Sequence, residues 1–278
     1  MNKIIIENFE SWAITIPKIL DQCNLAEKIA GQQQILLKPN LTINLPPPVS
    51  TPVEFVEEVV KFILKNSKAK IVIAEGAGGC DTQKCFSDLG YEKLAEKYPI
   101  ELIDLNLAQR IKKENPNAIK LKKVYLPQIS FESFIINLPV LKIHSEAKMT
   151  AALKNVFGFY LNSNWLMKKV GGLFGRSGEG WLATRSSALR RSEVWWNKSE
   201  LHFSGVNNSI KDLNNYIKFD FNLVDASIGQ LESEVHGLPC SPPIGKIIAG
   251  FDAKKVDIAC APLLNLDPKE IKYLNNLI

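Results

Sequence analysis

The stretch Phe134-Ile-Ile-Asn-Leu-Pro139-Val-Leu-Lys142-Ile-His144 decides the fold, because an apolar run is followed at once by basic side chains. The run over 134–138 predicts a buried strand, and Pro139 removes a backbone donor and ends its regular pairing. In an open α/β sheet, ligands bind beyond the carboxyl ends of the strands, where helix N-termini direct free N–H groups at anions. We therefore expect Lys142 and His144 to lie where a ligand binds.

The polar character continues through Thr150, Lys154 and Asn155. Thr150 is a suitable cap for a short helix that begins at Ala151 and closes at Gly158. The helix would start close to the end of the strand and direct its first turn at the same ligand.

Earlier in the chain, strands are predicted at 34–38, 70–75 and 100–105, with helices at 53–65 and 82–89. This β-α-β-α-β order predicts an α/β fold with a mostly parallel, Rossmann-like sheet and helices on both faces. Residues 106–130 are expected at an edge of the sheet. Later, we expect a helix at 209–217, a strand at 219–224 that ends at Asp225, a strand at 246–250, a helix at 255–264 and a last helix from 266.

Composition limits the class of protein. A chain of 278 residues, of which 46% are hydrophobic, can bury a sizeable core, and we expect one α/β domain over 1–278. The formal charge of +5 favours a small anionic ligand and does not require nucleic acid. A signal peptide and a membrane span are not apparent, so we expect a cytoplasmic protein without a membrane partner; a homo-oligomer is compatible with the sequence.

The five cysteines are scattered and include no C-x-x-C pair, so an iron–sulfur cluster held by this chain alone is not expected. Cys80 and Cys85 lie near a turn; they could be reactive, although we favour buried, inert thiols.

The glycine-rich turn over 76–79 follows the strand that ends at Glu75. It could hold a phosphate or carboxylate on its N–H groups, or it could simply be a tight connection between strand and helix. Glu75 is the better candidate for chemistry.

Residues 161–203 are rich in Gly, Arg and Trp and contain four of the five tryptophans. They could form a lid or a subunit contact, since Trp and Arg dominate interface energies, or an insertion that merely packs on the surface.

Several motifs together resemble the family catalogued as domain of unknown function 362. The pattern N-x-P-x-x-K-x-H, then T-x-x-x-K-N-x-x-G, is present between Asn137 and Gly158. Further resemblance lies upstream in Lys38-Pro39-Asn40, and downstream in Asp225, Gly250-Phe-Asp252, Asp257 and Leu266-Asp267-Pro268. The resemblance covers most of the chain, but the family name does not imply a reaction.

The interval from His144 to Lys154 is also similar to part of the nickel-pincer lactate racemase family. By this resemblance, Lys154 would match the lysine that tethers the cofactor, and His144 an acid–base histidine. No local ligand spacing predicts a metal site, so we assign no metal and leave the cofactor unknown.

These observations predict an enzyme that acts on a small carboxylate-type metabolite by acid–base chemistry, of a racemase- or isomerase-like kind. We expect His144, Lys154 and Asp225 to be catalytic. The expected substrate-binding residues are Lys38, Asn40, Glu75, Lys142, Thr150, Asn155, His202 and Asp252. The lysines could bind an anion and lower one another's pKa, or be ordinary solvated charges, and we favour the first. The alternative is a non-catalytic binding or electron-transfer accessory protein that uses 161–203 as an interaction surface.

Overall fold

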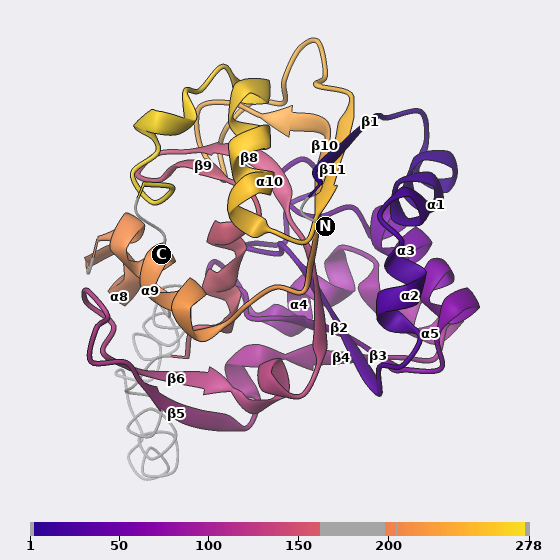
Figure 1. Ribbon diagram of the computed structural model, residues 1–278, viewed down its shortest axis with the longest axis horizontal. Coiled ribbons are helices and arrows are strands. Elements are labelled where there is room, and N and C mark those ends of the chain that lie inside the picture. The colour runs from indigo at the N-terminus through magenta and orange to yellow at the C-terminus, as the bar shows by residue number, and fades with distance from the viewer. Residues whose placement is uncertain (1–2, 162–197, 204, 276–278) are drawn as a thin grey trace, which may run out of the picture.

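The computed structural model describes residues 3–161, 198–203 and 205–275 (Figure 1). Apart from residue 161 and residues 198–203, the predicted Gly/Arg/Trp-rich insertion lies outside the described residues. Its role as a lid, contact or surface insertion therefore stays a prediction.

A nine-stranded sheet forms the centre of the described part of the molecule. Its strands follow the order β1 (Ile5–Asn8), β11 (Lys246–Gly250), β10 (Phe221–Gln230), β7 (Phe134–Leu138), β2 (Gln34–Pro39), β3 (Lys70–Glu75) and β4 (Ile100–Asp104). The four strands β7, β2, β3 and β4 are parallel, as is β10 against β7, whereas β11 runs antiparallel to both of its neighbours, β10 and β1. The predicted α/β fold with a mostly parallel sheet is confirmed.

Helices cover both faces of this sheet. Both faces are apolar, because successive apolar side chains of a buried strand point to opposite faces. In β2, Ile35 and Leu37 pack on one side and Leu36 on the other. The first side is covered by α1 (Trp12–Gln22), α2 (Leu25–Ile29), α3 (Val53–Asn66), α4 (Thr82–Asp88) and α5 (Tyr91–Lys97). The second is covered by the 3₁₀ helix η3 (Leu153–Phe159), α8 (Ser199–Phe203), α9 (Val206–Tyr216) and α10 (Ala253–Cys260) (Figure 1).

Pro139 ends β7 as predicted, but it interrupts strand pairing for a single residue only. The chain resumes as β8 (Val140–His144), which pairs with the second half of β10 and with the short β9 (Lys148–Thr150). The backbone N–H of Asp225 donates to the carbonyl of Pro139 over 2.9 Å, so Asp225 lies within β10 and does not end it. Thr150 belongs to β9 and caps no helix. The long strand β10 pairs with β8, and the periodicity of the sequence alone does not reveal this pairing.

Other differences concern the ends of elements. Residues 106–130 form a separate antiparallel pair, β5 (Arg110–Glu114) and β6 (Lys123–Pro127), with short 3₁₀ helices at Leu105–Leu107 and Gln128–Phe131, and not an edge of the main sheet. The helix expected at 255–264 is α10 followed by the 3₁₀ helix η4 (Ala261–Leu264), because Pro262 cannot continue an α-helix. The last helix is one 3₁₀ turn, η5 (Pro268–Glu270), with Asp267 as its cap.

Cys80 and Cys85 are buried as predicted, but they are joined by a disulfide and are not free thiols. Both cysteines are buried beside the start of α4. The bond spans the segment in which the Asp81 side chain accepts from the backbone N–H of Lys84 and caps α4.

In the described part of the chain, no helix combines the length and apolar character that crossing a membrane requires.

Candidate functional site

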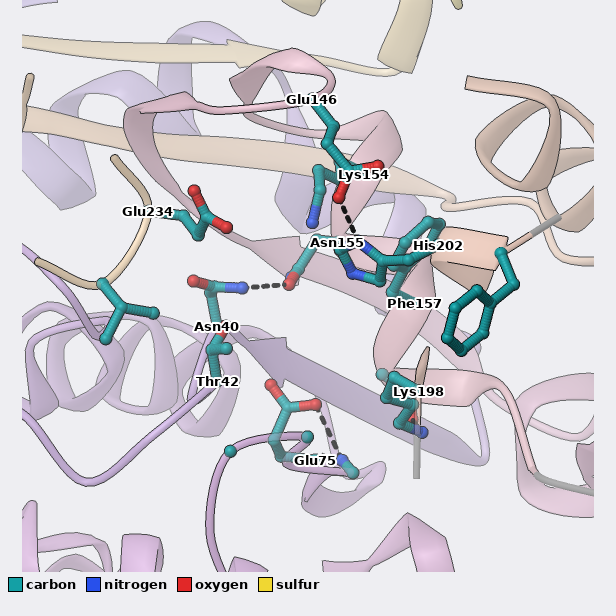
Figure 2. A pocket seen from close by; sticks show the side chains of 16 residues that line it. Asn40, Thr42, Glu75, Glu146, Lys154, Asn155, Phe157, Lys198, His202 and Glu234 are labelled. Atoms are coloured by element: carbon teal, nitrogen blue, oxygen red, sulfur yellow. Dashed lines mark hydrogen bonds and ion pairs between the residues drawn. The ribbon is translucent and has the colours of Figure 1, made fainter. Parts of the chain in front are cut away.

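A cavity of about 510 Å³ opens beyond the carboxyl ends of β2 and β3. Its walls come from segments far apart in the sequence, namely the ends of these two strands, the β8–β9 turn, η3, α8 and the loop after β10 (Figure 2). The polar side chains that line it are Asn40, Thr42, Glu75, Glu146, Lys154, Asn155, Lys198, His202 and Glu234. Five of the residues predicted from sequence are thus brought together: Asn40, Glu75, Lys154, Asn155 and His202.

The floor of the cavity contains a buried ion pair. Lys38 Nζ and Glu75 Oε1 are 2.7 Å apart, and the two side chains are 0% and 3% exposed. Glu75 also accepts from the backbone N–H groups of Gly76 and Leu41 over 2.7 and 2.9 Å. Burial lowers the pKa of Lys38, while Glu75 opposes this effect. The pair joins the ends of β2 and β3, and both of its charges are satisfied within the protein.

Two glycines allow the elements to close over this ion pair. A Cβ on Gly158 would lie 2.3 Å from Glu75 Oε1 and 2.5 Å from Lys38 Nζ, and one on Gly76 would lie 2.4 Å from the Gly158 carbonyl oxygen. None of these distances leaves room for a side chain. Gly76 and Gly158 therefore serve close packing, and both line the cavity together with Gly78 and Gly79.

Lys154 extends from η3 into the cavity and is partly buried. Its ammonium lies 4.6 Å from the centre of the Phe157 ring, and no residue that the structure describes forms a hydrogen bond or ion pair with it. Burial lowers its pKa to about 8, and Glu234 and Glu146 oppose this shift. A cation without a counter-ion in a concave site is suited to bind an anion.

His202 lies beside Lys154 and makes a hydrogen bond with Glu146, with 2.7 Å between Nδ1 and Oε1. A carboxylate partner holds the proton on Nδ1 and leaves Nε2 with a free lone pair. The ring of His144 stacks behind His202 at 6.1 Å between ring centres. His144 is 2% exposed, and its Nδ1 accepts from the backbone N–H groups of Glu146 and Ala147, at 3.1 and 3.2 Å.

Those two hydrogen bonds decide the tautomer of His144. Because Nδ1 accepts, the neutral ring carries its proton on Nε2, which lies 3.6 Å from Glu234 Oε1. Burial and the nearby Lys154, His202 and Lys142 lower the pKa of His144, so the ring is neutral. In this arrangement His144 supports His202 and Glu234 from behind the cavity wall.

Three other predicted residues are buried outside the lining. Lys142 donates to the carbonyl of Val49 over 2.6 Å, and burial followed by Lys154 lowers its pKa to about 7. The hydroxyl of Thr150 is buried without a hydrogen-bond partner among the described residues. Asp225 accepts from the backbone N–H of Ser227 over 2.8 Å, and burial raises its pKa to about 6. The catalytic role of Asp225 and the binding roles of Lys142 and Thr150 stay predictions.

Asp252 lies elsewhere: its side chain accepts from the backbone of Lys255 as the cap of α10. The position of Asp252 just after β11 is explained by its carboxylate capping α10.

Sequence reasoning missed Glu146, Lys198 and Glu234. Lys198 donates to the carbonyl oxygens of Gly158 and Tyr160, and burial lowers its pKa to about 7. Glu146 follows His144 by two residues, which places both around one tight turn. No local pattern marks Lys198 or Glu234, which reach the cavity through the packing of α8 and of the loop after β10.

No group of three His, Cys, Asp or Glu side chains that could hold a metal ion is found within the described ranges.

Comparison with known proteins gives a family and distant likenesses in fold. The family model described as "Domain of unknown function (DUF362)" matches residues 35–262. A crystal structure of a Thermotoga maritima protein is similar to the chain with 13% identity and a TM-score of 0.45, over 92% of this chain and 60% of that one. The lactate racemase apoprotein from Thermoanaerobacterium thermosaccharolyticum is similar with 15% identity and a TM-score of 0.45, over 92% of this chain and 56% of that one. The chain thus spans less than two thirds of either protein, and no curated protein matches it.

Proposed function

The chain belongs to the family described as domain of unknown function 362, and from this premise and the cavity we propose that it is an enzyme acting on a small carboxylate-bearing metabolite by acid–base chemistry. One observation carries the proposal: the hydrogen-bonded pair of Glu146 and His202 lies in the same cavity as the unpaired ammonium of Lys154. A base and a cation that face one space are the two groups that proton transfer next to a carboxylate needs.

We assign the acid–base role to His202. Glu146 orients its ring through the hydrogen bond to Nδ1, and Nε2 is free to take a proton from a bound molecule. His144, for which the sequence suggested this role, has its Nδ1 occupied by two backbone donors and its proton on Nε2. It is therefore better suited to hold the ring of His202 in place.

Lys154 binds the carboxylate of the substrate in this proposal. With a pKa of about 8 its side chain is mostly charged at neutral pH. Its attraction to an anion is strengthened in the partly buried site, where the effective dielectric constant is lower than in water. The aromatic face of Phe157 keeps the ammonium directed at the cavity.

The expected reaction is proton transfer at the carbon next to the carboxylate. The C–H bond breaks, its proton moves to Nε2 of His202, and its electron pair spreads onto the carboxylate beside Lys154. Return of a proton to that carbon completes an isomerase- or racemase-like cycle without a change in oxidation state.

Calorimetry and proton exchange together test the proposal. Short carboxylates and phosphate are titrated into the protein, and loss of the hydrogen at the carbon next to the carboxylate is followed by NMR in D2O. Lys154→Met should weaken carboxylate binding at least tenfold, while His202→Gln should keep binding within about threefold and abolish exchange. The control is Lys148→Met, an exposed lysine that pairs with Glu270 away from the cavity.

Equal carboxylate binding by the wild type and by Lys154→Met would contradict the proposal. Binding without exchange in the wild type would instead favour the non-catalytic binding protein.

A further inference from the structure

A chain of four asparagine side chains runs from the core to the cavity. The side-chain N–H of Asn40 donates to Asn155 over 2.9 Å, Asn155 donates to Asn137 over 2.8 Å, and Asn137 donates to Asn222 over 2.9 Å. Asn222 completes the series by donating to the carbonyl oxygen of Gly250 over 3.3 Å. Each amide therefore points its N–H group inward and its oxygen toward the cavity.

Backbone carbonyls fix the direction of the series. The oxygen of Gly250 can only accept, so Asn222 must present its NH₂ group there and its oxygen to Asn137. Asn137 likewise donates to the carbonyl of Ala152, and Asn155 donates to that of Pro39. Reversing any one amide would bring two donors together or two acceptors together. The last free atom of the series is consequently an oxygen, Oδ1 of Asn40.

Asn40 lines the cavity, and its Oδ1 is buried without a hydrogen-bond partner among the described residues. Asn40 is 8% exposed, so bulk water does not easily replace the missing partner. A buried acceptor left without a donor is unfavourable, and aligned amides polarise one another and strengthen the terminal oxygen as an acceptor. We therefore expect a ligand in the cavity to place a hydrogen-bond donor at Asn40 Oδ1.

A carboxylate lies on the same side of the cavity. Figure 2 shows Glu234 facing the oxygen end of the Asn40 amide. Glu234 accepts from Ser145 at 3.3–3.4 Å and lies 3.6 Å from His144, whose ring is neutral. No lysine or arginine within the described ranges forms an ion pair with it. The two oxygen-bearing groups make a negative pole.

Lys154 forms a separate positive pole of the same cavity. Glu234 and Lys154 attract each other strongly enough that Glu234 raises the pKa of the lysine, yet the two side chains form no ion pair. The two opposite charges therefore face the same cavity without forming an ion pair. A ligand that carries both a carboxylate and an ammonium would satisfy both poles at once.

We propose that the substrate is an amino-acid zwitterion, whose carboxylate binds Lys154 and whose ammonium donates to Asn40 Oδ1 and Glu234. This inference rests on the proposed function, because the carboxylate end uses the same lysine. The cavity of about 510 Å³ exceeds what the two charged groups need, and Phe157 offers an apolar wall for a side chain.

Matched ligands test the inference by calorimetry. Alanine, lactate and propionate share three carbons and differ at the second carbon in an ammonium, a hydroxyl or a hydrogen; phenylalanine, 3-phenyllactate and 3-phenylpropionate form a larger set. In the wild type, the amino acid of at least one set should bind tenfold or more tightly than its two partners. Glu234→Gln should remove this preference and keep propionate-type binding within about threefold, whereas Lys154→Met should weaken all members of the set.

Glu232→Gln is the control, because Glu232 is exposed in the same loop and does not line the cavity. It should leave the preference unchanged. If the three ligands of each set bind with equal affinity and Lys154→Met weakens all of them, the inference that the substrate is a zwitterion is wrong. The proposed function would still hold. Failure of all six ligands to bind the wild type would overturn both. Binding of Mg²⁺ or Ca²⁺ that Glu234→Gln abolishes would assign the negative pole to a metal ion and overturn the inference.

Discussion

The polar groups in the floor of the cavity have partners within the protein, whereas several in its wall lack comparable partners within the described part of the chain. In the floor, Lys38 and Glu75 are buried and saturate each other with help from backbone groups. In the wall, Lys154, Glu234 and the oxygen of Asn40 face the cavity without comparable partners among the described residues. The side chains are chemically alike, so what differs is whether the fold itself supplies the counter-charge.

This difference separates structural from functional polar groups. Groups whose partners are internal stabilise the native state, and removal of one partner strands the other in the core. Groups left without partners lower the stability of the native state, and a bound ligand can restore it. Substitutions in the floor should therefore change folding, whereas those in the wall should change binding.

The largest effect is expected from Glu75→Gln. It leaves the buried ammonium of Lys38 without a counter-ion, which should lower the free energy of unfolding by about 3–5 kcal/mol in urea titrations at neutral pH. The double variant Lys38→Met/Glu75→Gln should lose less than Glu75→Gln alone, because no charge is then stranded. A double variant that is less stable than the single one would break the comparison.

Gly158→Ala should follow, with a loss of about 1–3 kcal/mol. The new methyl group would overlap with Glu75 and Lys38, so the buried pair or η3 must shift. Gly31→Ala is the matched control, since a Cβ there would meet no atom within 4 Å. Thermal unfolding of the two variants side by side gives the measurement, and equal melting temperatures would show that the floor is loosely packed.

Stability should rise with pH through the window set by Lys154. Its pKa is about 8 in the folded protein against an ordinary 10.5, so between these values the unfolded chain binds a proton that the folded chain has lost. Stability then increases with pH, by about 1–3 kcal/mol for this one group. Lys154→Met should flatten the rise between pH 8 and 10, measured by urea unfolding, and Lys148→Met should not. An unchanged slope in Lys154→Met would mean that the ammonium is fully solvated.

The smallest effect on stability is expected from Glu146→Gln. Glu146 and His202 are 52% and 37% exposed, and exposed pairs of this kind contribute up to about 1 kcal/mol. We expect a change in unfolding free energy below about 0.5 kcal/mol, together with a clear loss of proton exchange at the substrate carbon. A loss of several kcal/mol of unfolding free energy would show that this pair stabilises the fold, as the buried pair of Lys38 and Glu75 does.

The strands of the sheet were predictable because they are short apolar runs bounded by Pro, Gly or charge. β2, β3, β4, β7 and β11 were expected within one residue of their observed bounds. β8 was missed because Lys142 and His144 alternate with Leu141 and Ile143, and their burial depends on β10 and β9, which come from elsewhere in the chain. Local polarity thus suggested side chains that face a ligand where the tertiary structure forms a buried strand.

The candidate site was predictable where it follows from strand ends and unpredictable where it follows from packing. Asn40 and Glu75 come directly after or at the end of a parallel strand, and the shared edge of the sheet brings them together. The choice between His144 and His202 depends on which ring nitrogen the backbone occupies, and that information exists only in three dimensions. Glu234 belongs to a loop whose partner, the β8–β9 turn, is some ninety residues earlier in sequence.

The position of β10 has a consequence for how the molecule assembles. This strand comes late in the chain yet lies in the interior of the sheet, paired with β7 and β8 on one side and β11 on the other. Strands β2, β3, β4 and β7 can associate before it is available, and they would then expose the apolar edge of β7 to other chains. Insertion of β10 closes that edge and carries Glu234 into place, so the rate of folding should be limited by this long-range pairing. A molecule able to bind its ligand is then one in which β10 has paired with β7 and β8.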